Sequence, residues 1–137
     1  MRVDKPLRWM GQTRKTLKSL PDEVKDEVGY SLRIAQQGGR ADNSSPMKGN
    51  LRTVSEIRVE EDSGAYRTIY TTQFEDVIYV LDVFRKKSRK GIATPRSDLN
   101  RIERRLKAAR IHYNEHGAPD TRGRTIPTTN PNKLRER

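Results

Sequence analysis

Residues 77–90 read VIYVLDVFRKKSRK and give the strongest indication of how the chain folds. Its first eight residues form an almost unbroken run of apolar, β-branched and aromatic side chains. Such a run is typical of a central strand buried on both faces, because an edge strand would alternate with polar residues. The run leads directly into a cluster of five cations: Arg85, Lys86, Lys87, Arg89 and Lys90. We therefore predict a rigid strand whose end presents a phosphate-binding cluster to solvent.

The segments before this strand predict two antiparallel neighbours. Residues 51–61 place Ile57 and Val59 on one face of a strand and acidic or basic residues on the other. Asp62-Ser63-Gly64 supplies turn chemistry, and residues 65–74 return as a second strand. With the central strand they form a three-stranded meander. Residues 5–10 predict a further short edge strand.

Helical patterns flank these strands. Residues 12–20 predict a short helix, and a longer one begins at Pro21 and ends at Gly38-Gly39, so the two form an antiparallel pair. Residues 40–50 are polar and predict a loop. A last helix begins after Thr94-Pro95, and its apolar stripe consists of Leu99, Ile102, Leu106, Ala109 and Tyr113. The opposite face carries Arg101, Arg104, Arg105, Lys107 and Arg110.

Length and composition predict one domain of residues 1–116, followed by a disordered basic tail of residues 117–137 with few apolar side chains. The net charge of +11 indicates a polyanionic partner, most simply a nucleic acid. The chain has no cysteine and no apolar run of membrane-spanning length, so a cytoplasmic protein without membrane contact fits best.

The excess charge is concentrated in one part of the sequence. Residues 85–110 contain eleven Lys or Arg residues and only two acidic residues. A uniformly solvated basic surface, which is the alternative interpretation, would not be concentrated in this way. We therefore predict RNA or ribosome contacts from Arg85, Arg89, Arg101, Arg104, Arg105 and Arg110.

Two further residue patterns leave alternatives open. Arg67 lies between two tyrosines in YRTIY, where it could clamp a phosphate or form a cross-strand pair with Glu56 or Glu60. His112 and His116 are four residues apart, which suits a metal site, but the absence of an obvious partner favours surface histidines.

Taken in order, these pieces resemble phage-related toxins of the RelE/HigB (ParE-like) superfamily. The most specific matches are EIRV at residues 56–59, YRTIY at residues 66–70 and VFRKKSRKGIATP at residues 83–95. The resemblance implies an α+β fold, in which an N-terminal helix pair packs on an antiparallel sheet of three to four strands, with a C-terminal helix.

The resemblance also implies a function. Such proteins are toxins of type II toxin–antitoxin systems that cleave messenger RNA, usually in the ribosomal A site, without a metal or cofactor. The products are a 2′,3′-cyclic phosphate and a 5′-hydroxyl. The catalytic residues carried over by position are Arg58, Arg67, Lys86, Lys87 and Lys90. Ile92 and Ala93 occupy the region where related RNases place a Tyr or His, so no general acid is assigned.

The implied partners are a cognate antitoxin of the helix-turn-helix class, messenger RNA and the ribosome. Two alternatives from other classes remain open. One is a non-catalytic gyrase inhibitor like the ParE branch, and the other is a nucleic-acid-binding phage regulator. The cationic cluster favours the endoribonuclease, since gyrase binding needs no phosphate clamp.

Overall fold

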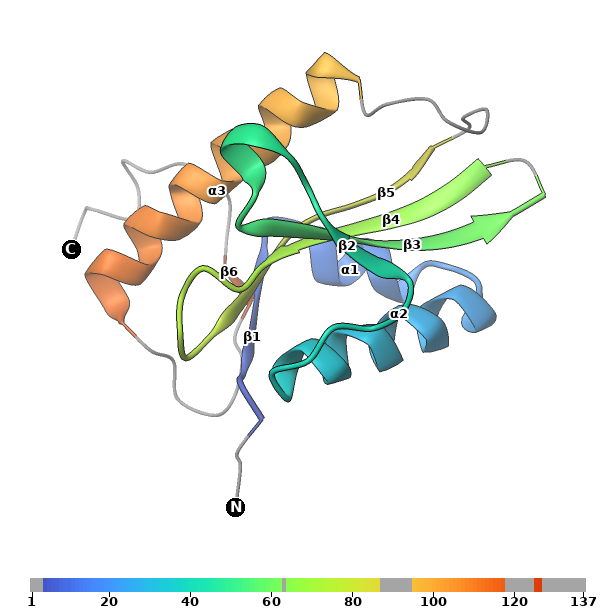
Figure 1. Ribbon diagram of the computed structural model, residues 1–137, viewed down its shortest axis with the longest axis horizontal. Coiled ribbons are helices and arrows are strands. Elements are labelled where there is room, and N and C mark those ends of the chain that lie inside the picture. The colour runs from blue at the N-terminus through green and yellow to red at the C-terminus, as the bar shows by residue number, and fades with distance from the viewer. Residues whose placement is uncertain (1–3, 63, 87–94, 118–124, 127–137) are drawn as a thin grey trace.

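A computed structural model describes residues 4–62, 64–86, 95–117 and 125–126 (Figure 1). Three α-helices, a short 3₁₀ helix and six strands occur in these residues. In chain order they are β1 (Leu7–Met10), α1 (Thr13–Lys18), α2 (Asp22–Gln36), β2 (Ser44–Pro46), η1 (Gly49–Leu51), β3 (Val54–Glu61), β4 (Gly64–Thr71), β5 (Ile78–Lys86), α3 (Arg96–His116) and β6 (Thr125–Ile126). The predicted α+β class and C-terminal helix are confirmed.

The strands form one mixed sheet in the order β2-β3-β4-β5-β1-β6. The predicted meander is confirmed, because β3, β4 and β5 pair antiparallel in sequence. The prediction of an antiparallel sheet of three to four strands is wrong, since six strands occur within the described residues and β1 lies parallel to both β5 and β6. Two α-helices and three strands lie between β1 and β5 in the chain, and β5 then runs in the same direction as β1. Because β5 and β6 pair with its two sides, β1 lies inside the sheet and is not the edge strand that the sequence predicted.

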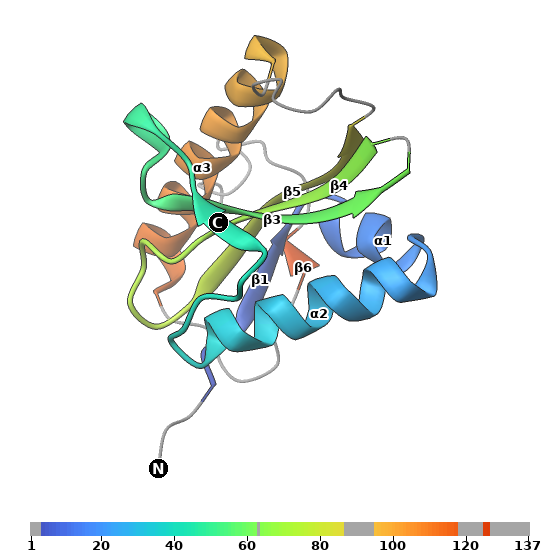
Figure 2. The ribbon, with the colours of Figure 1, turned by 45° about the vertical axis from the view of Figure 1, so that its right-hand side comes forward.

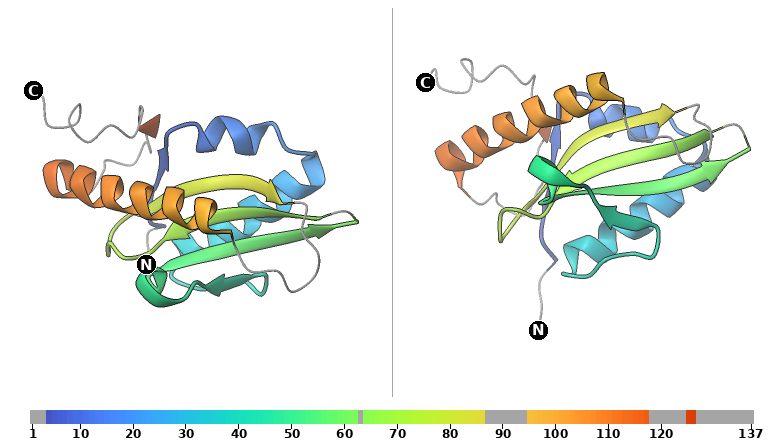
Figure 3. Two further views of the ribbon diagram at one scale, coloured as in Figure 1. Left: turned by 90° about the horizontal axis from the view of Figure 1, so that it is seen from above. Right: turned by 45° about the horizontal axis from the view of Figure 1, so that its top comes forward.

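Helices cover both faces of the sheet. Figures 2 and 3 show α1 and α2 on one side and α3 on the other. The α2 stripe of Val24, Val28 and Leu32 packs against Ile57 and other residues of the α2-side core. On the opposite face, Ile102 and Leu106 of α3 belong to a second core. The sheet is therefore buried on both sides, as the apolar run of β5 predicts.

Some predicted boundaries need correction. The predicted helix pair is present, but α1 has only six residues. The prediction that residues 40–50 form a loop is wrong in part, because β2 pairs with β3 and η1 follows it. Short polar pieces of this kind carry no periodic signal. The predicted tail lies almost entirely outside the described residues and stays a prediction, although Thr125–Ile126 pair with β1.

An irregularity in β5 changes which side chains face α3. The register with β4 runs Ile69 to Asp82 and then Tyr70 to Val80, so Leu81 is an extra residue. Leu81 packs in the α3-side core, and the Asp82 carboxylate also meets side chains of α3. A β-bulge re-aims side chains in this manner. Without it, strict alternation would turn Asp82 toward α2.

Candidate functional site

Three predicted catalytic residues lie on the α3-facing side of the sheet, near the end formed by the β3–β4 turn. Arg58 of β3 and Arg67 of β4 are directly opposite in the register. Lys86 ends β5 and is opposite Ala65, two residues before Arg67. Side-chain alternation from Val54 and Ile69, which belong to the α3-side core, places both arginines on that face. We call Arg58, Arg67 and Lys86 the cationic end.

The other predicted cations near this end are placed differently. Lys87, Arg89 and Lys90 lie outside the described residues, so their roles stay predictions. Arg85 points to the opposite face, where its guanidinium lies 5.6 Å from the ring centroid of Tyr66 and Arg85 Nε lies 3.5 Å from Glu61 Oε1. Arg85 therefore does not join the cationic end.

Each residue of the cationic end has a carboxylate partner. Arg67 is 3% exposed, and its Nε lies 3.0 Å from Glu56 Oε2 on β3. The cross-strand pair that the sequence left open is thus present. Arg58 Nε lies 3.0 Å from Glu60 Oε2, and Lys86 Nζ lies 3.4 Å from Asp98 Oδ2 at the start of α3. A phosphate that entered this end would exchange with these carboxylates as the anionic partner of the cations.

Two predicted RNA-binding arginines turn toward the sheet. Asp82, 5% exposed, accepts hydrogen bonds from Arg101 Nε at 2.7 Å and from Arg105 Nη1 at 2.9 Å. Arg101 Nη2 also donates to Asp98 at 2.8 Å, and Arg105 Nη1 donates to the Leu81 carbonyl at 2.9 Å. Burial lowers the pKa of Arg101, but the hydrogen bonds to Asp82 and Asp98 outweigh it and raise the pKa above its ordinary value.

The expected single basic face of α3 is therefore wrong for Arg101 and Arg105. The bulge in β5 directs Asp82 toward α3, and both arginines donate hydrogen bonds to its carboxylate. They fix α3 on the sheet, and their contact with RNA stays a prediction. Arg104, Lys107 and Arg110, in contrast, are exposed.

A buried polar cluster near the other end of α3 was missed by the sequence analysis. Arg8 of β1 is 6% exposed, Tyr79 of β5 is completely buried, and His112 of α3 is partly buried. Arg8 Nη1 donates to the Tyr79 hydroxyl and lies 3.2 Å from His112 Nδ1. The Tyr79 hydroxyl lies 2.9 Å from the same Nδ1. Because the hydroxyl accepts from Arg8, its own hydrogen is available to His112.

Burial controls the protonation of this cluster. It raises the pKa of Tyr79 to about 12, against the opposing effect of Arg8. It also lowers the pKa of His112 to about 4, together with the positive charges of Arg8 and His116. At neutral pH, His112 is therefore neutral with Nδ1 as an acceptor. None of the described carboxylates forms an ion pair with Arg8, so neutral groups hold this buried cation.

The surface-histidine interpretation is wrong for His112 and holds for exposed His116, whose ring centroid lies 4.4 Å from that of His112. Within the described ranges, no three His, Asp or Glu side chains gather as metal ligands do. The same ranges contain no helix of the length and apolar character that a membrane crossing needs.

Comparison with known proteins gives a family for this chain. Among solved structures, the chain is similar to one in the toxin–antitoxin complex RelBE2 from Mycobacterium tuberculosis. The two share 16% sequence identity with a TM-score of 0.42, and the match covers 64% of this chain and 98% of that chain. No curated protein matches the sequence. The family described as "Phage derived protein Gp49-like (DUF891)" matches residues 15–107, which is more than half of the chain. The protein therefore belongs to the Gp49-like family of phage-derived proteins.

Proposed function

We propose that this protein is the toxin of a type II toxin–antitoxin system and a metal-independent endoribonuclease that cleaves messenger RNA at the ribosomal A site. The observation that carries the proposal is the cationic end, where Arg58, Arg67 and Lys86 from three adjacent strands share one face. Membership of the Gp49-like family supports it, since the matched residues 15–107 include all three cations and the neighbouring Lys87 and Lys90.

The proposed chemistry uses the 2′-hydroxyl of the RNA itself. Its oxygen attacks the adjacent phosphorus, the bond to the 5′-oxygen breaks, and a 2′,3′-cyclic phosphate and a 5′-hydroxyl result. Negative charge increases on the phosphoryl oxygens in the transition state, and preorganised cations stabilise it there. Arg67 is the best placed for this role, because burial and Glu56 hold its guanidinium in one position.

Proton transfer also has candidates in this region. Glu56 is held against Arg67 and, once a phosphate takes its place as the partner, can accept the proton of the 2′-hydroxyl. Lys86, with Lys87 and Lys90 from the segment that follows, supplies further positive charge and a proton for the leaving oxygen. The cytoplasm is the compartment in which such a protein meets ribosomes.

The implied partner is an antitoxin that covers the cationic end. A basic site is most readily blocked by an acidic segment, such as a helix laid over the sheet by a helix-turn-helix protein. Binding of such a segment weakens as salt rises. Salt-insensitive binding that leaves the cationic end accessible would contradict this mode of neutralisation.

Inducible expression without a partner tests the proposal in cells. We expect growth arrest, a halt in translation and new messenger RNA ends within coding sequences. The control is the Arg67→Ala variant at the same expression level, which should arrest growth weakly or not at all. DNA-damage signalling with continued translation would contradict the endoribonuclease proposal and favour a gyrase inhibitor. No arrest at all would favour a nucleic-acid-binding regulator.

A further inference from the structure

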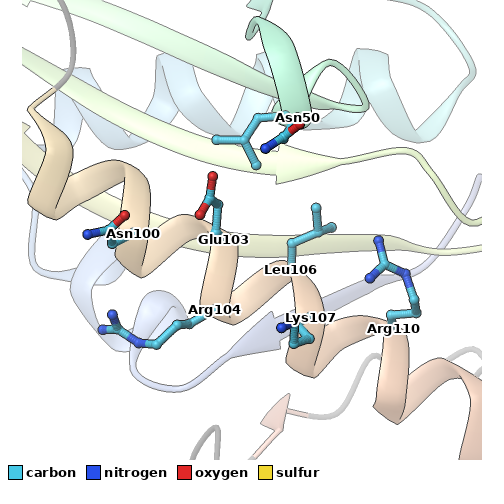
Figure 4. A pocket seen from close by; sticks show the side chains of 8 residues that line it. Asn50, Asn100, Glu103, Arg104, Leu106, Lys107 and Arg110 are labelled. Atoms are coloured by element: carbon cyan, nitrogen blue, oxygen red, sulfur yellow. The ribbon is translucent and has the colours of Figure 1, made fainter.

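A groove runs between η1 and α3, apart from the cationic end. It encloses about 530 Å³ and is lined by Asn50 and Leu51 of η1 and by Asn100, Glu103, Arg104, Leu106, Lys107 and Arg110 of α3. Figure 4 shows the α3 side chains following the helix along its length, with Asn50 across the groove. Lys107, Asn50 and Asn100 were not among the binding residues predicted from the sequence.

The three cations of this groove differ from the other arginines of α3. The side chains of Arg104, Lys107 and Arg110 are exposed and, within the described residues, form no ion pair or side-chain hydrogen bond. Arg101 and Arg105 are instead tied to Asp82. The free cations are spaced three residues apart, so they extend over about 9 Å of the helix axis. They form a row of charge, which matches a polyanion better than a single small anion.

The character of the lining favours RNA over a polypeptide. The two aliphatic residues of the groove, Leu51 and Leu106, are only 3% and 6% exposed, because both belong to the core. The groove therefore lacks the accessible apolar anchor around which protein interfaces concentrate their binding energy. Cations together with amide groups are the usual contacts to phosphates and sugars. The amides of Asn50 and Asn100 can both donate and accept, which suits ribose hydroxyls and base edges.

We propose that this groove binds the backbone of an RNA strand through Arg104, Lys107 and Arg110, and that Asn50 and Asn100 contact its sugars or bases. This inference rests on the proposed function and deepens it, because it assigns affinity for RNA to a surface separate from the cationic end. Lys86, Asp98 and Arg101 lie toward the start of α3, whereas the groove follows its middle. The groove holds RNA, and the cationic end acts on it.

A matched pair of variants tests the groove. The groove variant combines Arg104→Gln, Lys107→Gln and Arg110→Gln. The control variant combines Arg14→Gln, Lys15→Gln and Lys18→Gln, which removes the same charge from exposed positions of α1 on the other face. The probe is a short single-stranded 2′-O-methyl oligoribonucleotide, which cannot be cleaved through its 2′-oxygen. Fluorescence anisotropy across a salt series measures the affinity and its salt dependence, and thermal unfolding checks that each variant is folded.

The groove variant should lose at least about tenfold in affinity, and the slope of log affinity against log salt should fall by about 2, at about 0.7 for each of three phosphates released. The control variant should retain the slope of the wild type. Equal losses in both variants would show that only net charge matters and would overturn the proposal. An unchanged groove variant would overturn it too.

Two further measurements separate this inference from the proposed function. If the wild type cleaves RNA, the groove variant should require a higher enzyme concentration than the wild type to reach half of its maximal single-turnover rate. Alternatively, the wild type cleaves no RNA while the groove variant still binds the oligonucleotide more weakly than the wild type. That result would contradict the endoribonuclease proposal and support the groove as an RNA-binding surface. A groove variant that keeps RNA binding but loses affinity for poly-glutamate would assign the groove to an acidic protein partner and overturn the RNA assignment.

Discussion

Near the start of α3, Lys86 and Arg101 meet the carboxylates of Asp98 and Asp82, whereas near its end Arg8 meets the hydroxyl of Tyr79 and the ring of His112. Both regions place cations against the same face of one sheet. The first compensates each charge with an opposite charge. The second compensates the guanidinium of Arg8, which is more deeply buried than that of Arg101, with neutral hydrogen-bond acceptors.

The difference assigns different tasks to the two regions. A carboxylate partner can be exchanged for a phosphate, because both are oxyanions that a guanidinium or an ammonium binds. Neutral partners work only while His112 stays unprotonated, since a second cation beside Arg8 would be repelled. The cationic end, which includes Lys86, therefore suits reversible binding of an anion. The contacts of Arg101 with Asp82 and of Arg8 with Tyr79 and His112 are structural contacts between α3 and the sheet.

The first prediction, with the largest effect, concerns the proposed catalysis at the cationic end. Arg67→Ala should reduce single-turnover cleavage by roughly 10²–10³-fold, which is the effect of removing one preorganised donor from a transition state. Affinity for RNA should change far less, because the groove on α3 remains. Arg14→Ala in α1 is the control and should cleave normally. Wild-type cleavage by a folded Arg67→Ala protein would leave Arg67 as a cross-strand partner of Glu56 only.

The next effect is on stability and tests the contact between α3 and the bulge. Asp82→Asn leaves Arg101 and Arg105 without the carboxylate that they share. We expect a loss of roughly 2–4 kcal/mol in the free energy of unfolding, somewhat below the cost of breaking a fully buried pair because both arginines are partly exposed. Denaturant unfolding measures it. Asp22→Asn, which removes an exposed partner of Lys25, should cost less than about 1 kcal/mol. Equal losses would show that Asp82 is not a structural anchor.

The smallest effect is the pH dependence at the other end of α3. The pKa of His112 is about 4 in the folded protein and near 6.5 when unfolded. The unfolded chain therefore binds the extra proton first as pH falls. This contribution to stability is complete above about pH 6.5 and is lost progressively toward pH 4, on the order of 1–2 kcal/mol after allowance for solvent screening.

A variant can isolate that contribution from the carboxylates that titrate in the same range. His112→Gln keeps an acceptor for Tyr79 but cannot be protonated, so its stability should fall less steeply than that of the wild type between pH 6.5 and 4. The groups that face His112 are Arg8, Tyr79 and His116. His116→Gln is the control and should keep most of the wild-type slope. Identical slopes for His112→Gln and the wild type would contradict a neutral, partly buried His112.

Sequence reasoning succeeded where the structure depends on local periodicity. The apolar run before Arg85 predicted β5, and the stripe through Ile102 and Leu106 predicted α3. Alternation in β3 also placed Ile57 and Val59 on the face opposite Arg58. These features follow from the repeat of each element and require no knowledge of distant contacts.

Prediction from the sequence failed where the structure depends on contacts between residues that are distant in the chain. Arg8 and His112 are 104 residues apart in the chain, and only the parallel placement of β1 beside β5 brings them together. The bulge at Leu81 has no turn residue or glycine to mark it, so the approach of Asp82 to Arg101 was not foreseen. The pattern of α3 consequently predicted one basic face. In the structure, Arg101 and Arg105 pair with Asp82, whereas the side chains of Arg104, Lys107 and Arg110 form no ion pair with the described residues.

The chemistry of the RNA ends that the purified protein produces with a chelator present tests the claim that the cationic end cleaves RNA without a metal. If the cationic end performs metal-independent cleavage, ribosome-bound messenger RNA will yield 2′,3′-cyclic phosphate and 5′-hydroxyl ends, and a 2′-O-methyl group at the cut site will abolish cleavage. Ends that carry a 3′-hydroxyl and a 5′-phosphate, or cleavage that persists through the 2′-O-methyl group, would contradict the claim. Failure of the wild-type protein to cleave ribosome-bound RNA at all would do so equally.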